Sequence, residues 1–402
     1  MKSQNVKVLI INAGSSSLKY SVLECPGATP LAKGIAERLN TATACFNHRK
    51  GDQKWTWDIP SANHGDAIRK MLNVLTGANT GVITNTSELQ AVGHRIVHGG
   101  KYSGPAVVTD EVVTDIESYA IYAPLHNRAA AVGIRLMREM LPHSLHMTVF
   151  DTSFHRTIPP HAHLYGVQYE LAQKLGIRRY GFHGSSHQYV AERTAELMKK
   201  PLDSIKIITC HLGAGSSITA IDRGRSVDTS MGMTPLEGVV MGTRTGSMDP
   251  AIVELLMKHE NISIDQIDEF MNRKNGLQGL SGISSDMRDI VEAAQKGHPR
   301  AKLTLDIHNY QVRKYIGSYH FILGGVDAIT FTAGIGENSD YCRAEICKDM
   351  DFLKTKLDPE KNKAIRGEGF INTKDSKIKL LVVPTNEELI ITRVLWDNLQ
   401  KS

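Results

Sequence analysis

The stretch VLIINAGSSSLK, residues 8–19, decides the fold of this chain. It ends the apolar run Val6–Ile11 and begins a second one, Leu18–Leu23, with only small and polar residues between them. A buried strand, a tight turn and a returning strand make a β-hairpin. This pattern excludes the strand–loop–helix unit of a Rossmann fold, and it places a Gly-Ser turn between two strands.

The same pattern returns in the second half of the chain. The apolar run Ile205–Cys210 is followed by His211–Ser217, which is rich in glycine and serine, and then by the apolar run Ile218–Ile221. Two such hairpins, about half the chain apart, indicate an internal duplication. The sequence therefore predicts two related domains that face each other across a cleft.

Helical and strand-like patterns alternate between and after the hairpins. Apolar residues recur at three- and four-residue steps in Asn127–Met140, His187–Met198 and Ala301–Leu323. Strand-like apolar runs occur at Ala106–Thr109, Met147–Phe150, Ala328–Thr332 and Lys379–Val383. The predicted fold class is α/β with mixed sheets, and we expect the first domain to end after Phe150.

Composition narrows the class of protein. The 402 residues include 47 Lys and Arg against 42 Asp and Glu, which gives a formal net charge of +5. This mild excess suits a small anionic substrate, whereas nucleic-acid binding usually needs a clustered basic face. No apolar stretch approaches the ~20 residues of a membrane span, and the polar N-terminus is unlike a signal peptide. The five cysteines form no C-x-x-C pair, which indicates reduced thiols in the cytoplasm.

Four glycine-rich turns adjoin apolar strands, where backbone N–H groups can converge on an anion. They are Gly14–Ser17, Gly213–Ser217, Gly242–Gly246 and Gly334–Asn338. The chain has no P-loop motif, no complete G-x-G-x-x-G and no H-R-D motif of protein kinases. What remains is a hairpin-type phosphate loop repeated in two domains. This arrangement is typical of the actin–hexokinase superfamily, whose members bind ATP in the cleft between duplicated halves. Segment 328–338, a strand leading into a glycine-rich loop, is expected on the adenosine side.

Five longer motifs resemble those of one known protein family. They are VLIINAGSSSLK at 8–19, GFHGSSH at 181–187, SMGMTPLEGVVMGTR at 230–244, FTAGIGENS at 331–339 and PTNEE at 384–388. In this order, over residues 6–395, the chain resembles the acetate kinase (acetokinase) family. The resemblance implies reversible in-line phosphoryl transfer, ATP + acetate ⇌ ADP + acetyl phosphate, with Mg²⁺ (or Mn²⁺ in its place), in a homodimer. It also implies two duplicated ribonuclease H-like domains with mixed five-stranded sheets and an interdomain cleft.

The resemblance assigns catalytic roles to Arg95, Asp151, His183 and Arg244. A carboxylate substrate is already ionised at neutral pH, so it needs no general base. The difficulty is the approach of one anion to another, which positive charge and alignment relieve. Arginines can pair with the carboxylate or the phosphoryl group, and Asp151 would hold Mg²⁺ through water or orient an arginine. His126 is a weaker candidate.

Asn12 and Glu387 match the metal ligands of the family, and Mg²⁺ prefers such oxygen donors. Thr385 and Glu388 have the T-x-x-E spacing of a capping box, so a final helix is expected from Glu388, which would make Glu388 structural and Glu387 functional. Because Glu387 must meet Asn12, the last helix should return to the first domain. The predicted domains are therefore 1–150 with 385–402, on the acyl and metal side, and 151–384, which binds the nucleotide.

Nucleotide contacts follow from the same resemblance. The residues concerned are Lys19, His211, Leu212, Gly213, Ala214, Gly215, Asp286, Met287, Arg288, Gly334, Ile335, Gly336, Glu337 and Asn338. The chain departs from the family at Ala214, where many relatives have Asn. A side-chain amide contact to phosphate is therefore absent there, while the backbone N–H groups can still serve.

The acyl pocket of the family corresponds to Val97, Leu125, Phe182 and Pro235, together with Arg95. These apolar side chains would enclose a methyl group, and one extra methylene is worth only about 1–3 kcal/mol in such a pocket. Acetate is the favoured substrate, and a kinase for propionate or butyrate is the alternative. A non-catalytic nucleotide switch of the actin type is the second alternative, and a hydrolase is disfavoured by the absence of a G-x-S-x-G elbow.

Overall fold

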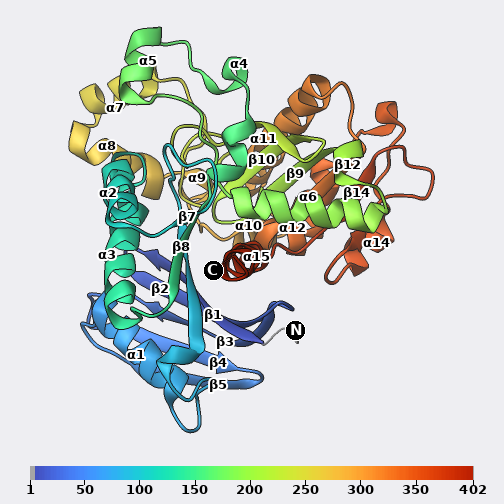
Figure 1. Cartoon of the computed structure of the whole chain (residues 1–402). Coiled ribbons are helices and arrows are strands. Elements are labelled where there is room, and N and C mark those ends of the chain that lie inside the picture. The colour runs from blue at the N-terminus through green and yellow to red at the C-terminus, as the bar shows by residue number, and fades with distance from the viewer. Residues whose placement is uncertain (1–4, 402) are drawn as a thin grey trace. The chain divides into compact units, whose positions relative to one another are not determined.

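The computed structural model describes residues 5–401 apart from the side chain of Leu125, so residues 1–4 and 402 lie outside the described part. The chain divides into two units. The first runs to Ser153 and takes in the C-terminal segment from Asn386, and the second comprises Phe154–Thr385. Each unit contains one mixed β-sheet with helices packed on both of its faces (Figure 1).

The sheet of the first unit has the strand order β5-β4-β3-β2-β1-β6-β8-β7. Strands β1 to β5 pair antiparallel in sequence, β6 and β8 run parallel to β1, and β7 closes the edge antiparallel to β8. The strands are β1 (Val6–Gly14), β2 (Ser17–Cys25), β3 (Thr29–Glu37), β4 (Cys45–Lys50), β5 (Gln53–Asp58), β6 (Leu89–Ile96), β7 (Ala106–Val107) and β8 (Leu145–Phe150).

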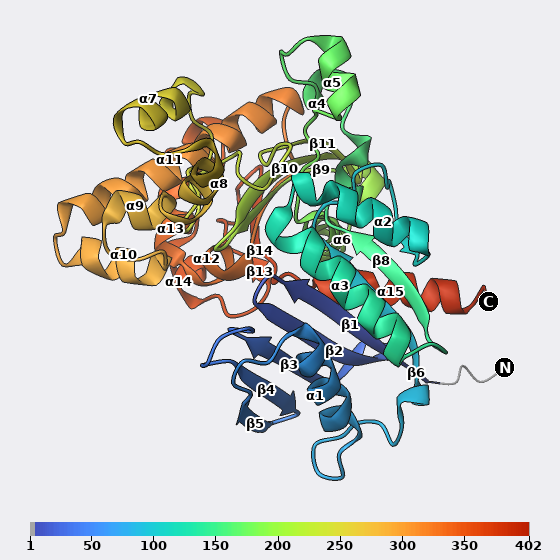
Figure 2. The ribbon, with the colours of Figure 1, turned by 90° about the vertical axis from the view of Figure 1, so that its left-hand side faces the viewer.

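Successive side chains of β1 point to opposite faces of the sheet and pack in two different hydrophobic cores. Leu9 packs with α1 and α3 on one face, whereas Val8 packs with α15 on the other. Gly93 in β6 allows this close approach of α15, since a Cβ there would lie 2.5 Å from Ile391 Cγ2. Figure 2 shows α1 and α3 on one side of the strands and α15 on the opposite side. The helices of this unit are α1 (His64–Thr76), α2 (Asp110–Ser118), α3 (Pro124–Met140) and α15 (Glu387–Leu399).

The sheet of the second unit has the order β11-β10-β9-β12-β14-β13. Strands β9 to β11 are antiparallel, β12 and β14 run parallel to β9, and β13 is antiparallel to β14. The strands are β9 (Lys206–Leu212), β10 (Ser216–Asp222), β11 (Arg225–Thr229), β12 (Ala328–Thr332), β13 (Gly369–Phe370) and β14 (Lys379–Val382).

Helices cover both faces of this second sheet as well. Ile207 of β9 packs with α6 on one face, and Ile208 packs with α9, α10, α11 and α13 on the other. The helices of this unit are α4 (Pro160–His163), α5 (Tyr169–Leu175), α6 (Gly184–Met198), α7 (Ala251–His259), α8 (Ile264–Arg273), α9 (Gly276–Ser281), α10 (Met287–Gln295), α11 (Pro299–Ile322), α12 (Ala333–Asn338), α13 (Asp340–Ile346) and α14 (Pro359–Ala364).

A five-strand core is common to both sheets and confirms the predicted duplication. The order β3-β2-β1-β6-β8 in the first unit corresponds to β11-β10-β9-β12-β14 in the second, with three antiparallel strands followed by two parallel ones in each. The predicted number of five strands per sheet is wrong for the complete sheets. The first has eight strands, because β4, β5 and β7 extend it at its edges, and the second has six, because β13 is added.

Two local predictions are corrected. The segment Gly334–Asn338 is not a loop, since α12 begins directly after β12, at Ala333. The last helix has no T-x-x-E capping box: it begins at Glu387, and the side chain of Asn386 caps it by accepting from Leu389 N at 3.0 Å. The hydroxyl of Thr385 is engaged elsewhere, as a donor to Ser186 Oγ at 2.7 Å.

All five cysteines are buried and none of them forms a disulfide. Within residues 5–401, no helix combines the length and the apolar character that a membrane crossing requires.

Candidate active site

Arg95, in β6, lies between two carboxylates. Its Nε and Nη2 donate to the two oxygens of Asp151 at 2.9 Å each, and its Nη1 lies 2.8 Å from Glu387 Oε2. Asp151 follows β8, the neighbour of β6, and Glu387 is the first residue of α15. Three elements of the first unit thus meet at one guanidinium group.

Burial and charge act in opposite directions on this cluster. Burial lowers the pKa of Arg95, but the carboxylates of Asp151 and Glu387 outweigh it and raise the pKa above the ordinary value. Burial likewise raises the pKa of the Asp151 carboxyl, and the Arg95 guanidinium opposes that change. The two-point contact with the protonated arginine favours the ionised form of Asp151 and so opposes the effect of burial.

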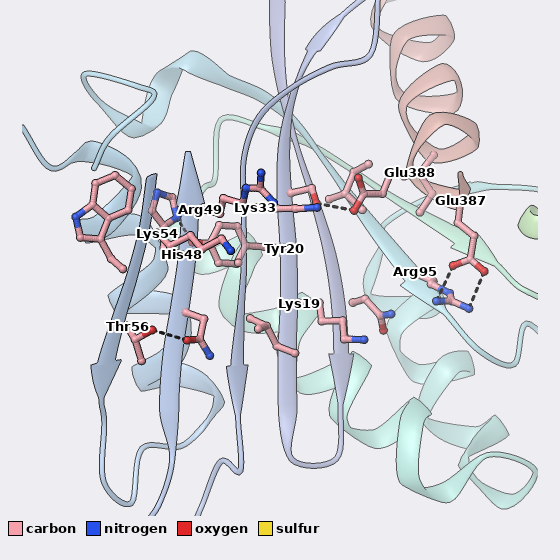
Figure 3. Close-up of a pocket in the computed structure, with 18 residues that line it drawn as sticks. Lys19, Tyr20, Lys33, His48, Arg49, Lys54, Thr56, Arg95, Glu387 and Glu388 are labelled. Carbon is pink, nitrogen blue, oxygen red and sulfur yellow. Dashed lines mark hydrogen bonds and ion pairs between the residues drawn. The ribbon is translucent and has the colours of Figure 1, made fainter. Parts of the chain in front are cut away.

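A cavity of about 540 Å³ opens beside this cluster, within the first unit. Asn12, Lys19, Arg95 and Glu387 line one end of it, and its floor continues across β3, β4 and β5. Figure 3 shows Arg95 and Glu387 pointing toward each other, with Lys19 on the neighbouring hairpin. The register of that hairpin sets Asn12 directly opposite Lys19, so four of the predicted residues share one surface.

Glu388, also at the cavity, has a structural contact that differs from the predicted one. Its Oε1 accepts a hydrogen bond from Ser21 Oγ at 2.6 Å, which fastens the start of α15 to β2. This contact holds Glu387 over the sheet, beside Arg95.

The donor set of the first unit fits a magnesium ion. Asn12 offers an amide oxygen that no other group in the described part engages, and Asp151 and Glu387 offer carboxylates that retain lone pairs beyond those facing Arg95. Mg²⁺ takes oxygen ligands and keeps several waters. No cluster of three or more His, Cys, Asp or Glu suited to a metal exists among the described residues, so any such ion would depend on water and on substrate oxygens.

In the second unit, His183 stands just before α6 with a left-handed backbone, φ +57°. Its Nδ1 lies 2.9 Å from Ser217 Oγ in β10, and its ring stacks on that of His211 with centroids 4.0 Å apart. His155 holds this turn, because its Nε2 donates to the carbonyl of Phe182 at 2.9 Å. Burial lowers the pKa of His155 to about 4, so this histidine is a neutral structural group.

Arg244 lacks the carboxylate partners that Arg95 has. Its Nη1 donates to the carbonyl of Pro235 at 3.1 Å, and within residues 5–401 no ion pair forms with it. Burial lowers its pKa, which marks a desolvated cation. A Cβ placed on Gly215 would lie 3.5 Å from Arg244 Nη1 and 3.4 Å from His183 Nε2. Two positively polarised side chains therefore flank the bare backbone of Gly215.

The β9–β10 turn adds backbone donors at this place. The N–H of Gly213 is satisfied by Ser216 Oγ at 3.1 Å, and the carbonyl of Ala214 accepts from Gly242 N at 3.2 Å. Among the described residues, the N–H groups of Ala214 and Gly215 have no hydrogen-bond partner. They can therefore serve an anion even though position 214 carries no side-chain amide. Leu212, at the end of β9, is buried in the core.

The other predicted nucleotide residues lie on two helix starts. Asp286 caps α10 and pairs with Arg288 at 2.6 Å, a contact that lowers the pKa of Asp286 to about 2. The side chain of Met287 is buried in the core, which leaves only its backbone for a ligand. Residues 334–338 form α12, where Glu337 accepts from Thr385 N at 3.2 Å and Asn338 donates to the Gly334 carbonyl.

The predicted acyl-pocket residues are divided between the units. Val97 is half-buried at the end of β6 in the first unit. Phe182 is buried, and Pro235 partly so, in the second unit. The side chain of Leu125 lies outside the described part. His126, in α3, acts on Asp151 electrostatically and lowers its pKa.

Comparison with known proteins now decides the family. The model of the acetokinase family matches residues 7–393. The chain belongs to the acetokinase family. Acetate kinases of Thermotoga petrophila and Halothermothrix orenii are similar to it, at 50% and 49% identity over 392 residues. In each case the match covers 96% of this chain, with 97% and 98% of the relatives.

Solved structures agree with this membership. The acetokinase chain superposes on acetate kinase of Porphyromonas gingivalis with a TM-score of 0.93 and 40% identity, over 98% of this chain and 100% of that one. A propionate kinase of Francisella tularensis matches with a TM-score of 0.90 and 36% identity, over 96% and 98%. The two-sheet α/β fold is thus that of acetokinases.

Sequence reasoning missed several residues of this acetokinase site. Ser217, Ser186 and His187 surround the stacked histidines His183 and His211. Their signal is present in the motif GFHGSSH and in the pair Ser216-Ser217, but the sequence interpretation of these segments gives no role to the serine hydroxyl groups.

Proposed function

We propose that this chain is an acetate kinase, which transfers the γ-phosphoryl group of ATP to acetate and returns it from acetyl phosphate to ADP. The observation that carries the proposal is Arg244, a half-buried guanidinium with no carboxylate partner in the described part, beside His183 and the bare backbone of Gly215. Such a set fits an anion that carries several oxygens. Acetate kinases at 48–50% identity over 96% of the chain support it.

In this proposal, the second unit supplies the charge that the transferring phosphoryl group needs. Arg244 and His183 donate to its equatorial oxygens, and His211 with the free amides of Ala214 and Gly215 holds the neighbouring phosphates. These donors are set in place by the fold before the substrate arrives, which is how electrostatic stabilisation of a phosphoryl transfer is achieved. The segments 286–288 and 334–338 are proposed to surround the adenosine.

The first unit is proposed to hold the acyl acceptor. Arg95, oriented by Asp151 and Glu387, is proposed to face the acetate carboxylate, and Val97 is proposed to contact the methyl group. Asn12 and Glu387 would hold Mg²⁺, and Lys19 would reach the ATP phosphates. When bound, the ion neutralises phosphate charge. No side chain is asked to act as a base, because acetate is already ionised at neutral pH.

A substrate panel tests the function. Purified protein with ATP and Mg²⁺ is offered acetate, propionate or butyrate, and the acyl phosphate is trapped as a hydroxamate. We expect kcat/KM to be highest for acetate and product to vanish when EDTA removes the metal. A higher kcat/KM for propionate than for acetate would make the chain a propionate kinase. If no acid gives an ATP-dependent product, the remaining alternative is a non-catalytic nucleotide switch.

We also propose that the enzyme is a cytoplasmic homodimer. Free, buried cysteines suit a reducing compartment, and the dimer follows from family membership. Light scattering coupled to size exclusion tests the assembly. A mass near twice the 44.3 kDa of one chain is expected, and a mass near 44.3 kDa would contradict the dimer.

A further inference from the structure

Two chains of buried hydroxyl and imidazole groups end at the stacked pair His183 and His211. Both lie within the second unit, and the sequence assigns no role to any of their side-chain hydroxyl groups. Each chain can be followed proton by proton, because a hydroxyl group has one hydrogen to donate and a neutral imidazole has one N–H.

The first chain runs from β9 through α6 to β10. Thr209 Oγ1 lies 2.7 Å from His187 Nδ1, His187 Nε2 lies 2.7 Å from Ser217 Oγ, and Ser217 Oγ lies 2.9 Å from His183 Nδ1. Burial lowers the pKa of His187 well below its ordinary value, with neighbouring histidines adding to the effect. His187 is therefore neutral and carries one ring proton.

Only one direction of hydrogen-bond donation along this chain gives every buried N–H and O–H hydrogen an acceptor. Thr209 is fully buried, and His187 Nδ1 is its side-chain hydroxyl's one partner among the described residues. If His187 donated to Thr209, the Thr209 hydroxyl hydrogen would be left without an acceptor, at a cost of about 1–3 kcal/mol. Thr209 therefore donates to His187, His187 donates to Ser217, and Ser217 donates to Nδ1 of His183.

The second chain reaches His211 from the end of the second unit. The hydroxyl of Thr385 donates to Ser186 Oγ at 2.7 Å, and Ser186 Oγ lies 2.8 Å from His211 Nδ1. Ser186 is fully buried, so its own hydrogen needs an acceptor, and His211 Nδ1 is in place for it. The direction is therefore the same: a hydroxyl hydrogen is donated to Nδ1 of the imidazole.

We propose that Ser217 and Ser186 are positioning residues that fix both His183 and His211 in the tautomer with the proton on Nε2. The consequence rests on the proposed function: each ring presents an N–H donor, not a lone pair, to the phosphate oxygens. Without the hydroxyl groups either ring could take the other tautomer, whose Nε2 lone pair would repel an anionic oxygen. The two rings, with centroids 4.0 Å apart, thereby act as paired neutral donors.

Nitrogen NMR on the whole protein tests the tautomers directly. Histidine is labelled with ¹⁵N, and two-bond ¹H–¹⁵N spectra distinguish a protonated Nε2 from a protonated Nδ1. Signals are assigned by their loss in His183→Gln and His211→Gln. We expect both rings of the wild type in the Nε2–H form at pH 7.5. A protonated Nδ1 on either ring would overturn the proposal for that chain.

Paired variants separate positioning from simple packing. Ser217→Ala should broaden or shift the His183 and His187 signals and leave His211 unchanged, whereas Ser186→Ala should do the reverse. In each variant kcat should fall about tenfold or more, since a lost oxyanion donor typically costs 10²–10³, while KM for ATP changes far less. Thr194→Val removes another buried hydroxyl of α6, bonded to Thr330, and should alter neither the signals nor kcat.

The outcomes distinguish this inference from the proposed function. Wild-type tautomers and wild-type kcat in Ser217→Ala would refute the positioning role of Ser217. If the tautomers are as stated and respond to the serines, but His183→Gln retains full activity, the hydroxyl chains stand and the phosphate-binding role of His183 fails.

Discussion

Arg95 and Asp151 form a two-point ion pair, with Nε–Oδ1 and Nη2–Oδ2 both at 2.9 Å. The pair joins neighbouring parallel strands, and the Asp151 side chain is only 4% exposed. Without Asp151, the buried Arg95 would keep only Glu387 as a counter-charge. Orientation of the arginine and stability of the first unit are thus coupled in a single contact.

Asp151→Asn should therefore affect both properties. We expect kcat/KM for acetate to fall about a hundredfold, since a misplaced catalytic group costs that much, and the free energy of unfolding to fall by about 3 kcal/mol. Steady-state kinetics and urea denaturation measure these quantities. The surface pair of Arg135 and Glu117 provides the control: Glu117→Gln should change the stability by less than about 1 kcal/mol. Wild-type kinetics in Asp151→Asn would contradict the orienting role.

Arg244→Ala should lower the activity without lowering the stability of the protein. Because Arg244 has no carboxylate partner in the described part, its removal strands no opposite charge. We expect kcat/KM to fall by about 10³ or more, as for other phosphoryl-transfer arginines, with no loss of thermal stability. Differential scanning calorimetry measures the thermal stability, and the hydroxamate assay measures the activity. A variant that is active, or one that is unfolded, would argue that Arg244 is a structural residue.

Gly215→Ala should block the phosphate position. The added Cβ would make ordinary contacts of 3.4 Å with His183 Nε2 and 3.5 Å with Arg244 Nη1, so the protein should fold normally. It would nevertheless fill the space between the two donors, and kcat/KM for ATP should fall at least tenfold by loss of alignment. Gly166→Ala, where a Cβ meets nothing within 4 Å, is the matched control. Equal activity in the two variants would show that this space is not used.

Val97→Ala should widen the acyl pocket. One methylene is worth about 1–3 kcal/mol in such a pocket, so the ratio of kcat/KM for propionate to that for acetate should rise about tenfold. Competition assays with both acids in one reaction measure this ratio. If it stays constant, Val97 does not line the acyl pocket.

Stability should fall as the pH drops below about 6.5. Burial lowers the pKa of His94 to about 3, with His146 adding to the effect, and that of His155 to about 4. The unfolded chain protonates both histidines near pH 6.5 while the folded chain does not, so their stabilisation is complete above that pH and is lost below it. We expect about 2 kcal/mol per histidine to be lost between pH 7 and 5.

Urea midpoints at pH 7.5, 6 and 5 test this dependence. His155→Gln should show a shallower decline than the wild type, whereas replacing the exposed His143 by glutamine should leave the decline unchanged. A midpoint that is constant from pH 7.5 to 5 would exclude buried neutral histidines as the cause.

The central strands could be predicted from the sequence, and the peripheral ones could not. Val6–Ile11 and Ile205–Cys210 are apolar runs, because β1 and β9 are buried on both faces. Strand β4 ends in Arg49 and Lys50, and β5 alternates between half-buried and exposed residues. Edge strands with charged residues have no comparable signal, which is why the eight-stranded sheet was underestimated.

The sequence predicts that Glu387 meets Asn12 and that Asp151 can orient an arginine, but it does not predict that both carboxylates meet at Arg95. Arg95 reaches Asp151 and Glu387, which are 56 and 292 positions away, and pattern reasoning within a window cannot join such distances. The α12 segment shows the same limit. Its glycines favour a loop, yet Arg343 donates to the carbonyls of Gly336 and Glu337 and satisfies the end of a short helix.

Helix α15 has a consequence for biosynthesis. Ile391 and Leu395 complete the core on one face of the first sheet, and Glu387 and Glu388 complete its polar contacts, yet these residues are made only after the second unit. The ribosome must synthesise the whole of Phe154–Thr385 before they emerge, which takes roughly ten seconds to a minute at 5–20 residues per second. During that interval the N-terminal sheet exposes an apolar face, while the second unit has its entire sequence and can fold first.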